Sequence, residues 1–126
     1  MSKPGFLALR VYRLSEKFAD ALGRVTAKWP EFHRNTVGEQ LVRAADGIGA
    51  NLAAGYGRGT YEGNRRHVLA ARAALYETLH WLRRAFRRKM LAEEQIEKLK
   101  PLVDELGRRL RAYLRKLGEA AAASNG

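Results

Sequence analysis

Apolar residues recur every three or four positions through four successive runs of this 126-residue chain. This spacing places an apolar stripe along one face of a helix, whereas the alternation typical of a strand is absent. The sequence therefore predicts an all-α protein. The first run, with steps of four, three, four, four, three and four, consists of Leu7, Val11, Leu14, Phe18, Leu22, Val25 and Trp29.

We expect four helices, which span roughly residues 6–29, 36–55, 60–89 and 92–118. Helices of this length joined by short loops pack most simply as an antiparallel up-down-up-down four-helix bundle. The apolar fraction of 46% supplies enough side chains for one packed core. The sequence therefore predicts a single domain over residues 1–126, with a frayed tail over 119–126.

The expected helix ends depend on local capping signals. Pro30 ends the first helix, because the residue before a proline is driven out of the α region. Thr36 and Glu39 have the spacing of a capping box at the start of the second helix, and Gly55 is its expected C-cap. Thr60 is the expected N-cap of the third helix.

Glycine and proline also occur inside the expected helices. Gly47 and Gly49 each cost a helix about 1 kcal/mol relative to alanine, so we expect them where a neighbouring helix approaches closely. Pro101 predicts a kink in the fourth helix, or a short first segment that ends near Lys100. Gly118 is expected to end that helix.

Several classes of protein are excluded or disfavoured by composition. The absence of cysteine excludes a disulfide scaffold, a thiolate metal site and a cysteine nucleophile. The longest uncharged stretch, residues 47–57, is far shorter than the roughly 20 residues of a membrane span. His33, His67 and His80 show no HxxxH or HExxH spacing. We therefore expect a cytoplasmic protein without a metal, a cofactor, membrane association or enzymatic activity.

The chain is strongly basic, with 24 Lys and Arg against 13 Asp and Glu and a net charge of +11. Two segments without any acidic residue carry much of this charge. They comprise Arg83, Arg84, Arg87, Arg88 and Lys89 in the third helix, and Arg108, Arg109, Arg111, Arg115 and Lys116 in the fourth.

Helical spacing places part of this charge in rows. On the third helix one row flanks the core face over about 33 Å and consists of Arg65, Arg72, Tyr76, Arg83 and Arg87. Arg111 and Arg115 have a similar place on the fourth helix. An arginine row of this length can meet several phosphates, and Tyr76 can stack on an unpaired base. The candidate nucleic-acid contacts are Arg65, Arg72, Tyr76, Arg83, Arg84, Arg87, Arg88, Lys89, Arg111 and Arg115.

Three functional hypotheses follow. The first is a non-catalytic bundle that binds RNA or DNA backbone with little sequence preference. The second is an adaptor for a protein partner, for example a polymerase-like one, and the third is a metal-dependent bundle enzyme. Purely solvated basic faces also fit the charge pattern, and a helix cap explains the glycines at 55, 57 and 59 better than a phosphate loop does.

Residues 40–58, which read QLVRAADGIGANLAAGYGR, carry a family resemblance. They resemble the Q-[LI]-x-R-A-A-x-S-I-x-x-N-I-A-E-G-x-G-R motif of a bacterial four-helix-bundle family first recognised in intervening sequences of 23S ribosomal RNA genes. Residues 71–77 resemble its A-R-G-S-x-x-E segment. The departures are Gly47 for serine, Ala54 for glutamate, and Ala73 and Ala74 for Gly-Ser. The matching residues are Arg43, Asn51, Gly55, Gly57, Arg58 and Glu77.

The resemblance implies a closed homopentamer with a basic surface or central channel, and no enzymatic activity. A related branch is the accessory protein of diversity-generating retroelements, which binds nucleic acid and a reverse transcriptase. Ala54 puts in doubt any role that depends on the family's glutamate. Trp81 lies outside the core stripe, on the side of its helix opposite the arginine row, and is our candidate anchor of an oligomer interface.

Overall fold

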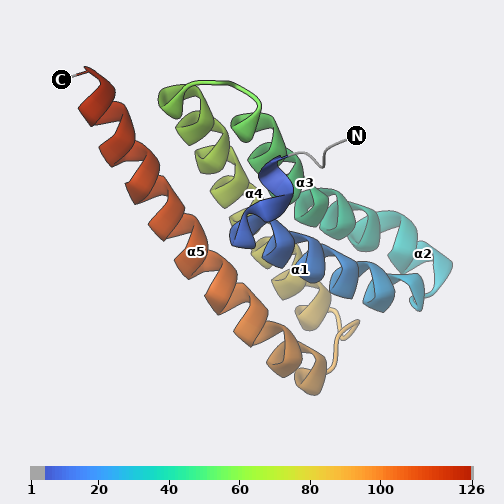
Figure 1. Ribbon diagram of the computed structural model, residues 1–126. Helices are drawn as coiled ribbons and strands as arrows, with labels where there is room; N and C mark the ends of the chain where they lie inside the picture. The colour runs from blue at the N-terminus through green and yellow to red at the C-terminus, as the bar shows by residue number, and fades with distance from the viewer. Residues whose placement is uncertain (1–4, 126) are drawn as a thin grey trace.

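The computed structural model describes residues 5–125, and their side chains except those of residues 7, 8 and 125. This part of the chain is helical almost throughout (Figure 1). The elements in order are a 3₁₀ turn (Gly5–Ala8), α1 (Arg10–Ala27), α2 (Glu31–His33), a π-helical turn (Arg34–Gly38), α3 (Glu39–Tyr56), α4 (Tyr61–Arg87) and α5 (Glu93–Asn125).

The long helices α1, α3, α4 and α5 alternate in direction and form a four-helix bundle (Figure 1). Each of them packs closely against two others, in the cyclic order α1, α3, α4 and α5, whereas the backbones of the diagonal pairs stay further apart in the described residues. The predicted all-α, up-down-up-down architecture is therefore confirmed. The C-terminal part of α5 extends past the start of α1 and accompanies the first turns of α4 (Figure 1).

The core forms where the apolar stripes of these helices meet. Among its fully buried members are Phe18 of α1, Ile48 of α3, Val68 of α4 and Leu106 of α5. Phe86 follows Leu79 and Leu82 at the spacing of the apolar stripe of α4, but it is 45% exposed. It lies in the last turn of α4, where it borders an open groove beside α5 rather than the bundle interior.

The second helical segment begins earlier than expected, directly after Pro30. Proline suits a helix start, because its fixed φ is helical and its missing N–H would have had no partner there. The predicted capping box is wrong: Thr36 lies inside the π-helical turn, and its hydroxyl donates to the carbonyl of Phe32 (2.7 Å). The chain then continues into α3 without a break.

The turn between α3 and α4 confirms one cap and corrects another. Thr60 is the N-cap of α4, because its hydroxyl accepts a hydrogen bond from the Gly63 amide (3.1 Å). Gly55 is not a C-cap: α3 continues to Tyr56, and Gly57 follows its last residue. Gly55 is instead buried against α4.

α5 runs without interruption through Pro101 and Gly118 to Asn125, so the expected segment end near Lys100 and the helix end at Gly118 are wrong. Residues 119–125 of the expected frayed tail are helical, and residue 126 lies outside the described residues. Pro101 lies on the solvent side, and Gly118 packs beside the Arg65 guanidinium of α4. The alanines after Gly118 have the highest helix propensity of any residue and extend the helix further.

α4 ends in a Schellman motif. The Met90 amide donates to the Ala85 carbonyl (2.8 Å), and the Lys89 amide donates to the Phe86 carbonyl (3.0 Å). This geometry requires a left-handed residue, and Lys89 adopts it with φ of 62°. The reversal brings α5 back along α4, so that the two helices form the outer groove described next.

Candidate nucleic-acid interface

A groove of about 410 Å³ runs between α4 and α5 on the outside of the bundle. Arg72 and Tyr76 line it from α4, and Asp104, Arg108 and Arg111 line it from α5. Its floor consists of Leu75, Leu79, Val103, Gly107 and Leu110. We call this feature the α4–α5 groove. It brings together three of the arginines in the basic segments and rows described above, from two helices.

The three arginines of the α4–α5 groove are not neutralised. Within residues 5–125, Arg72, Arg108 and Arg111 form no ion pair with a carboxylate. The nearby carboxylate of Glu105 is engaged by Arg10 of α1 (2.8 Å) and, more distantly, by Arg109 (4.0 Å). The hydrogen bond from Arg10 lowers the pKa of Glu105. The charge of Arg108 lowers this pKa further, so Glu105 offsets part of the Arg108 charge although its ion pairs are with Arg10 and Arg109.

Tyr76 presents an open aromatic face in the same groove, with 67% of its surface exposed. An exposed tyrosine ring beside guanidinium groups is a suitable platform for an unstacked base. The combination of ring and guanidinium groups was predicted from helical spacing on α4 alone. The contributions of Arg108 and Arg111 depend on how α5 packs against α4.

Other predicted contacts extend along the same pair of helices. Arg65 lies beside Gly118 of α5, and Arg83 borders the next groove towards the end of α4. Arg115 follows Arg111 by one helical turn, so it faces the same side of α5. Arg87 and Lys89 border an open hollow at the turn between the helices. All five are exposed and have no ion pair within the described residues.

Arg84 and Arg88 lie on a different side of α4. They follow Glu77 by seven and eleven residues, which places them on the same helix face as Glu77, towards α3. The consecutive basic segment at the end of α4 is thus divided between two faces. Only Arg83 and Arg87 of that segment extend the row of Arg65 and Arg72.

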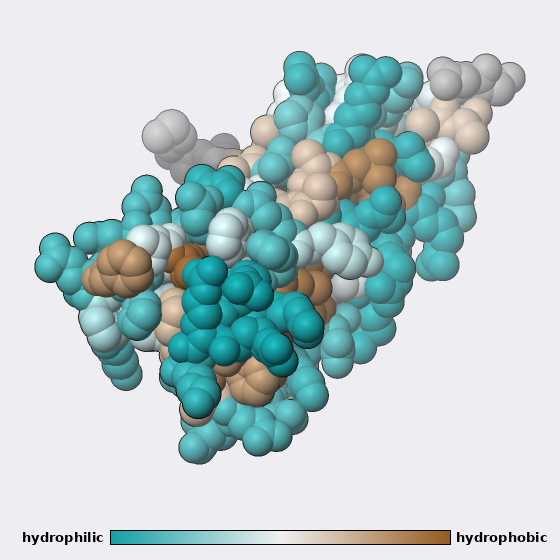
Figure 2. All heavy atoms as spheres, turned by 180° about the vertical axis from the view of Figure 1, so that it is seen from behind, coloured by the Kyte–Doolittle hydropathy of each residue, from teal (hydrophilic) through white to brown (hydrophobic). Residues whose placement is uncertain are grey.

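An apolar groove of about 270 Å³ continues from the α4–α5 groove, with which it shares Leu79 and Val103. Arg83 and Lys100 stand beside it, and Lys100 pairs with Glu97 (3.1 Å). The rest of its lining is apolar and consists of Leu82, Phe86, Ile96 and Leu99. Seen from behind the view of Figure 1, the surface is mostly hydrophilic, with separate apolar areas (Figure 2).

Two of the motif residues, Arg43 of α3 and Glu77 of α4, form an ion pair across the two helices. Gln40 accepts a further hydrogen bond from Arg43 (3.0 Å), and the indole of Trp81 donates to Glu77 (3.1 Å). The Trp81 hydrogen bond and the Arg43 guanidinium lower the pKa of Glu77. Trp81 is half-buried rather than exposed, and its ring packs edge-on against His80. Its role in an oligomer interface stays a prediction.

A second polar connection braces α3 to α4 near the turn. Arg58 donates to Nε2 of His67 (3.0 Å), and Nδ1 of His67 lies 3.4 Å from the Asn51 side-chain oxygen. His67 thus connects Arg58, which follows α3, with Asn51 inside α3. His67 was missed as a partner of the motif, because its sequence spacing resembles no known site.

A family model for the 23S rRNA-intervening sequence protein matches residues 8–112. The chain belongs to this family. No curated protein matches the chain. Among solved structures, it is similar to a protein of unknown function from the S23 ribosomal protein family of Bacteroides thetaiotaomicron VPI-5482. The two share 21% sequence identity and a TM-score of 0.72, over 82% of this chain and 97% of the other. That similarity shows a shared fold.

In this member of the 23S rRNA-intervening sequence family, five of the six motif residues lie at contacts that join α3 and the following turn to α4. Arg43 pairs with Glu77, Asn51 and Arg58 contact His67, and Gly55 allows α4 to approach. Ala54, which replaces the family's glutamate, is exposed. It takes part neither in the Arg43–Glu77 ion pair nor in the contacts of His67. The conspicuous motif therefore fixes the α3–α4 pair, and the candidate binding groove lies elsewhere, between α4 and α5.

Two other site types find no support in the described part of the chain. Glu77 and His80 have the ExxH spacing used in di-metal bundles. However, Glu77 is engaged by Arg43 and Trp81, and residues 5–125 contain no group of three metal-binding side chains. None of the helices in that range is long and apolar enough to cross a membrane.

Proposed function

We propose that this protein binds nucleic acid through the α4–α5 groove, by contacts to phosphate rather than by catalysis. One observation carries the proposal: Arg72, Arg108 and Arg111 converge from two helices without carboxylate partners within the described residues. Arginine suits this role because its planar guanidinium group donates two parallel hydrogen bonds to a phosphate.

The charge balance of the groove supports the same reading. Three guanidinium groups face one carboxylate, that of Asp104, so the groove carries a net local charge of about +2. Arg65 and Arg83 extend the basic row beyond both ends of the groove, over about 27 Å at a rise of about 1.5 Å per residue. A row of this length spans several phosphates of a nucleic-acid strand.

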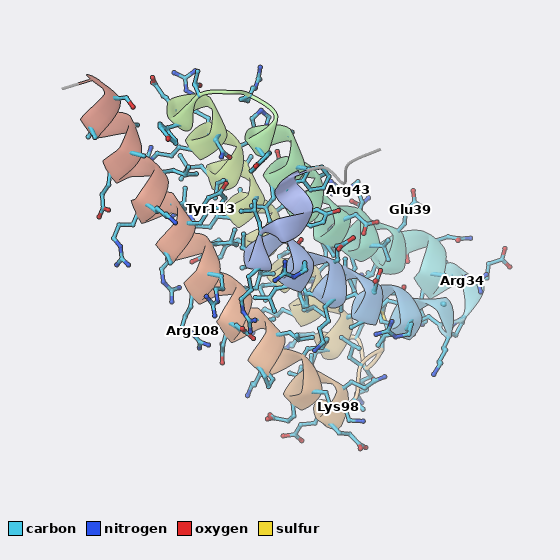
Figure 3. All side chains as sticks on the ribbon, in the orientation of Figure 1. Arg34, Glu39, Arg43, Lys98, Arg108 and Tyr113 are labelled. Carbon is cyan, nitrogen blue, oxygen red and sulfur yellow. The ribbon has the colours of Figure 1, made fainter. Side chains whose placement is uncertain are left out.

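The test compares two charge-matched double variants. Arg72→Gln with Arg111→Gln removes two charges from the groove, whereas Arg24→Gln with Arg34→Gln removes two exposed charges elsewhere. Figure 3 shows that Arg34 lies at the α2–α3 end of the bundle, far from Arg108 on α5. Binding of a labelled structured RNA and a duplex DNA is measured by fluorescence anisotropy at about 50 mM salt.

We expect the groove variant to bind at least tenfold more weakly than the wild type, with a similar loss for both nucleic acids, because phosphate contacts carry little sequence information. The control variant is expected to bind within about threefold of the wild type. No binding by the wild type at this salt concentration, or an equal loss in the two variants, would contradict the proposal.

The apolar groove favours a second function, in which a protein partner docks on the bundle. Phe86 is 45% exposed there, beside Ile96 and Leu99. A partner that is retained in a pull-down after nuclease treatment, and released by Phe86→Ser, would support this adaptor function. Loss of every partner after nuclease treatment would favour nucleic-acid binding instead.

The family resemblance adds a proposed assembly, a closed homopentamer with Trp81 at the subunit contact. Five copies of the 14.2 kDa chain give a mass of about 71 kDa. Sedimentation equilibrium of the wild type and of Trp81→Ala measures this mass. A wild type that sediments as a monomer would exclude the assembly.

A further inference from the structure

We propose that the α4–α5 groove selects an unpaired guanine nucleotide, with its phosphate on Arg72 and Arg111, its base on Tyr76 and its Watson–Crick edge at Asp104. This inference rests on the proposed function and names the nucleotide that the groove prefers. Asp104 is the reason for this inference, because a groove that bound phosphate alone would gain nothing from a carboxylate.

Asp104 stands among the three arginines of the groove, yet it pairs with none of them. Within residues 5–125 its carboxylate makes no ion pair and no hydrogen bond, although Arg108 follows one helical turn later. A carboxylate in a site for phosphate alone weakens binding by repulsion. Both oxygens of Asp104 are therefore available to a group that donates hydrogen bonds.

The order of side chains along the groove matches the layout of one nucleotide. α4 and α5 are antiparallel, and Arg65 lies beside Gly118, so Arg72 lies opposite Arg111 and Tyr76 lies opposite Gly107. Asp104 comes one turn beyond Gly107, about 10 Å along α5 from Arg111. The groove thus presents in turn a phosphate-binding end, an aromatic ring and a hydrogen-bond acceptor.

The middle of the groove has room for a base. Gly107 has no side chain opposite Tyr76, and the floor there is formed by Leu75, Leu79 and Val103. The Arg111 guanidinium reaches back to this point, with Nη1 3.6 Å from where a Cβ at Gly107 would stand. A base that stacks on the Tyr76 ring therefore rests on the apolar floor, beside this guanidinium group. The groove volume of about 410 Å³ lies within the usual range of small-ligand pockets, about 300–1,000 Å³.

The carboxylate distinguishes guanine from the other bases. An ionised carboxylate only accepts hydrogen bonds and can accept two in parallel. Guanine offers two adjacent donors, N1–H and the N2 amino group, on its Watson–Crick edge. Adenine and cytosine place a donor next to an acceptor there, and uracil flanks its one N–H with two carbonyl groups that repel a carboxylate.

The test uses uridine oligomers of about twelve nucleotides whose central position is guanosine, inosine, adenosine or uridine. Inosine keeps N1–H and lacks the N2 amino group. We expect the wild type to bind the guanosine oligomer about tenfold more tightly than the adenosine and uridine oligomers, with inosine between them. A bidentate contact of this kind discriminates by roughly 5- to 150-fold.

Asp104→Asn is expected to abolish the guanosine preference and to bind the uridine oligomer at least as tightly as the wild type. Asp46→Asn, which removes an exposed carboxylate from α3, is the matched control and keeps the preference. Thermal unfolding of both variants verifies that they are folded.

The outcomes separate this inference from the proposed function. Equal wild-type binding of the four oligomers, together with weak binding by the Arg72→Gln, Arg111→Gln variant, overturns the guanine inference and leaves phosphate binding intact. A preference that persists in Asp104→Asn also overturns it. Failure of the wild type to bind any oligomer overturns both.

Discussion

Gly55→Ala tests the closest approach between α3 and α4. A methyl group at position 55 would lie 2.6 Å from Oδ1 of Asn64, 2.8 Å from Cβ of His67 and 3.0 Å from the Asn64 carbonyl oxygen. The last of these atoms belongs to the backbone of α4, so a side-chain rotation alone does not relieve the overlap. The two helices must therefore separate, and the Asn64 side chain must also move, which disturbs its hydrogen bond to the Tyr113 hydroxyl (2.9 Å).

Two opposing terms set the expected size of the effect. Alanine in place of glycine inside a helix stabilises by about 1 kcal/mol. Overpacking of a close contact costs about 1–3 kcal/mol, and the loss of a part-buried hydrogen bond costs about 1 kcal/mol. We therefore expect Gly55→Ala to lower the free energy of unfolding by about 1–3 kcal/mol.

Gly23→Ala is the matched control, because nothing lies within 4 Å of a methyl group at that position of α1. It retains only the helix-propensity gain, so we expect it to raise the free energy of unfolding by about 0.5–1 kcal/mol. Urea titrations followed by circular dichroism measure both variants. A Gly55→Ala protein that is stabilised as much as Gly23→Ala would refute the close helix contact.

Two further predictions concern α4. The pKa of Glu77 is lowered in the folded state by Trp81 and Arg43. These interactions therefore stabilise the fold at pH values above the ordinary glutamate pKa of about 4.3. The stabilisation is lost as the pH falls through the lower, folded-state pKa. The melting temperature of Glu77→Gln should therefore change less between pH 6 and pH 3 (about the range of that titration) than that of the wild type; identical pH profiles would exclude the pair. Lys89→Gly should raise the free energy of unfolding by about 1 kcal/mol, because glycine adopts the left-handed φ of 62° without steric cost, and a destabilised variant in the same urea titration would contradict the turn geometry.

Local sequence patterns predict the structural features, such as helices and their caps, that depend on residues close together in the chain. Helical spacing identified the bundle, and the position of Thr60 before an apolar run identified its cap. Competing local signals explain the errors: Pro30 starts a helix as readily as it ends one, so Thr36 is not at a helix end. At Gly118, packing beside Arg65 and the alanines that follow outweigh one glycine.

Local sequence patterns could not predict which residues of different helices contact one another. Arg43 and Glu77 are 34 residues apart, and their pairing depends on how α3 and α4 cross. The convergence of Arg72 with Arg111 likewise depends on the register between α4 and α5. For the same reason, the consecutive arginines at 83 and 84 looked like one cluster, although adjacent helical residues point about 100° apart.

The salt dependence of binding tests the central claim most directly, because it counts the phosphate contacts that the groove makes. For a single-stranded ligand each contact contributes about 0.7 to the slope of log K against log salt concentration. If Arg72 and Arg111 each contact a phosphate, the double glutamine variant should show a slope shallower by about 1.4 than the wild type, while the Arg24→Gln, Arg34→Gln control keeps the wild-type slope. Equal slopes for the wild type and the groove variant would show that these arginines do not meet phosphate.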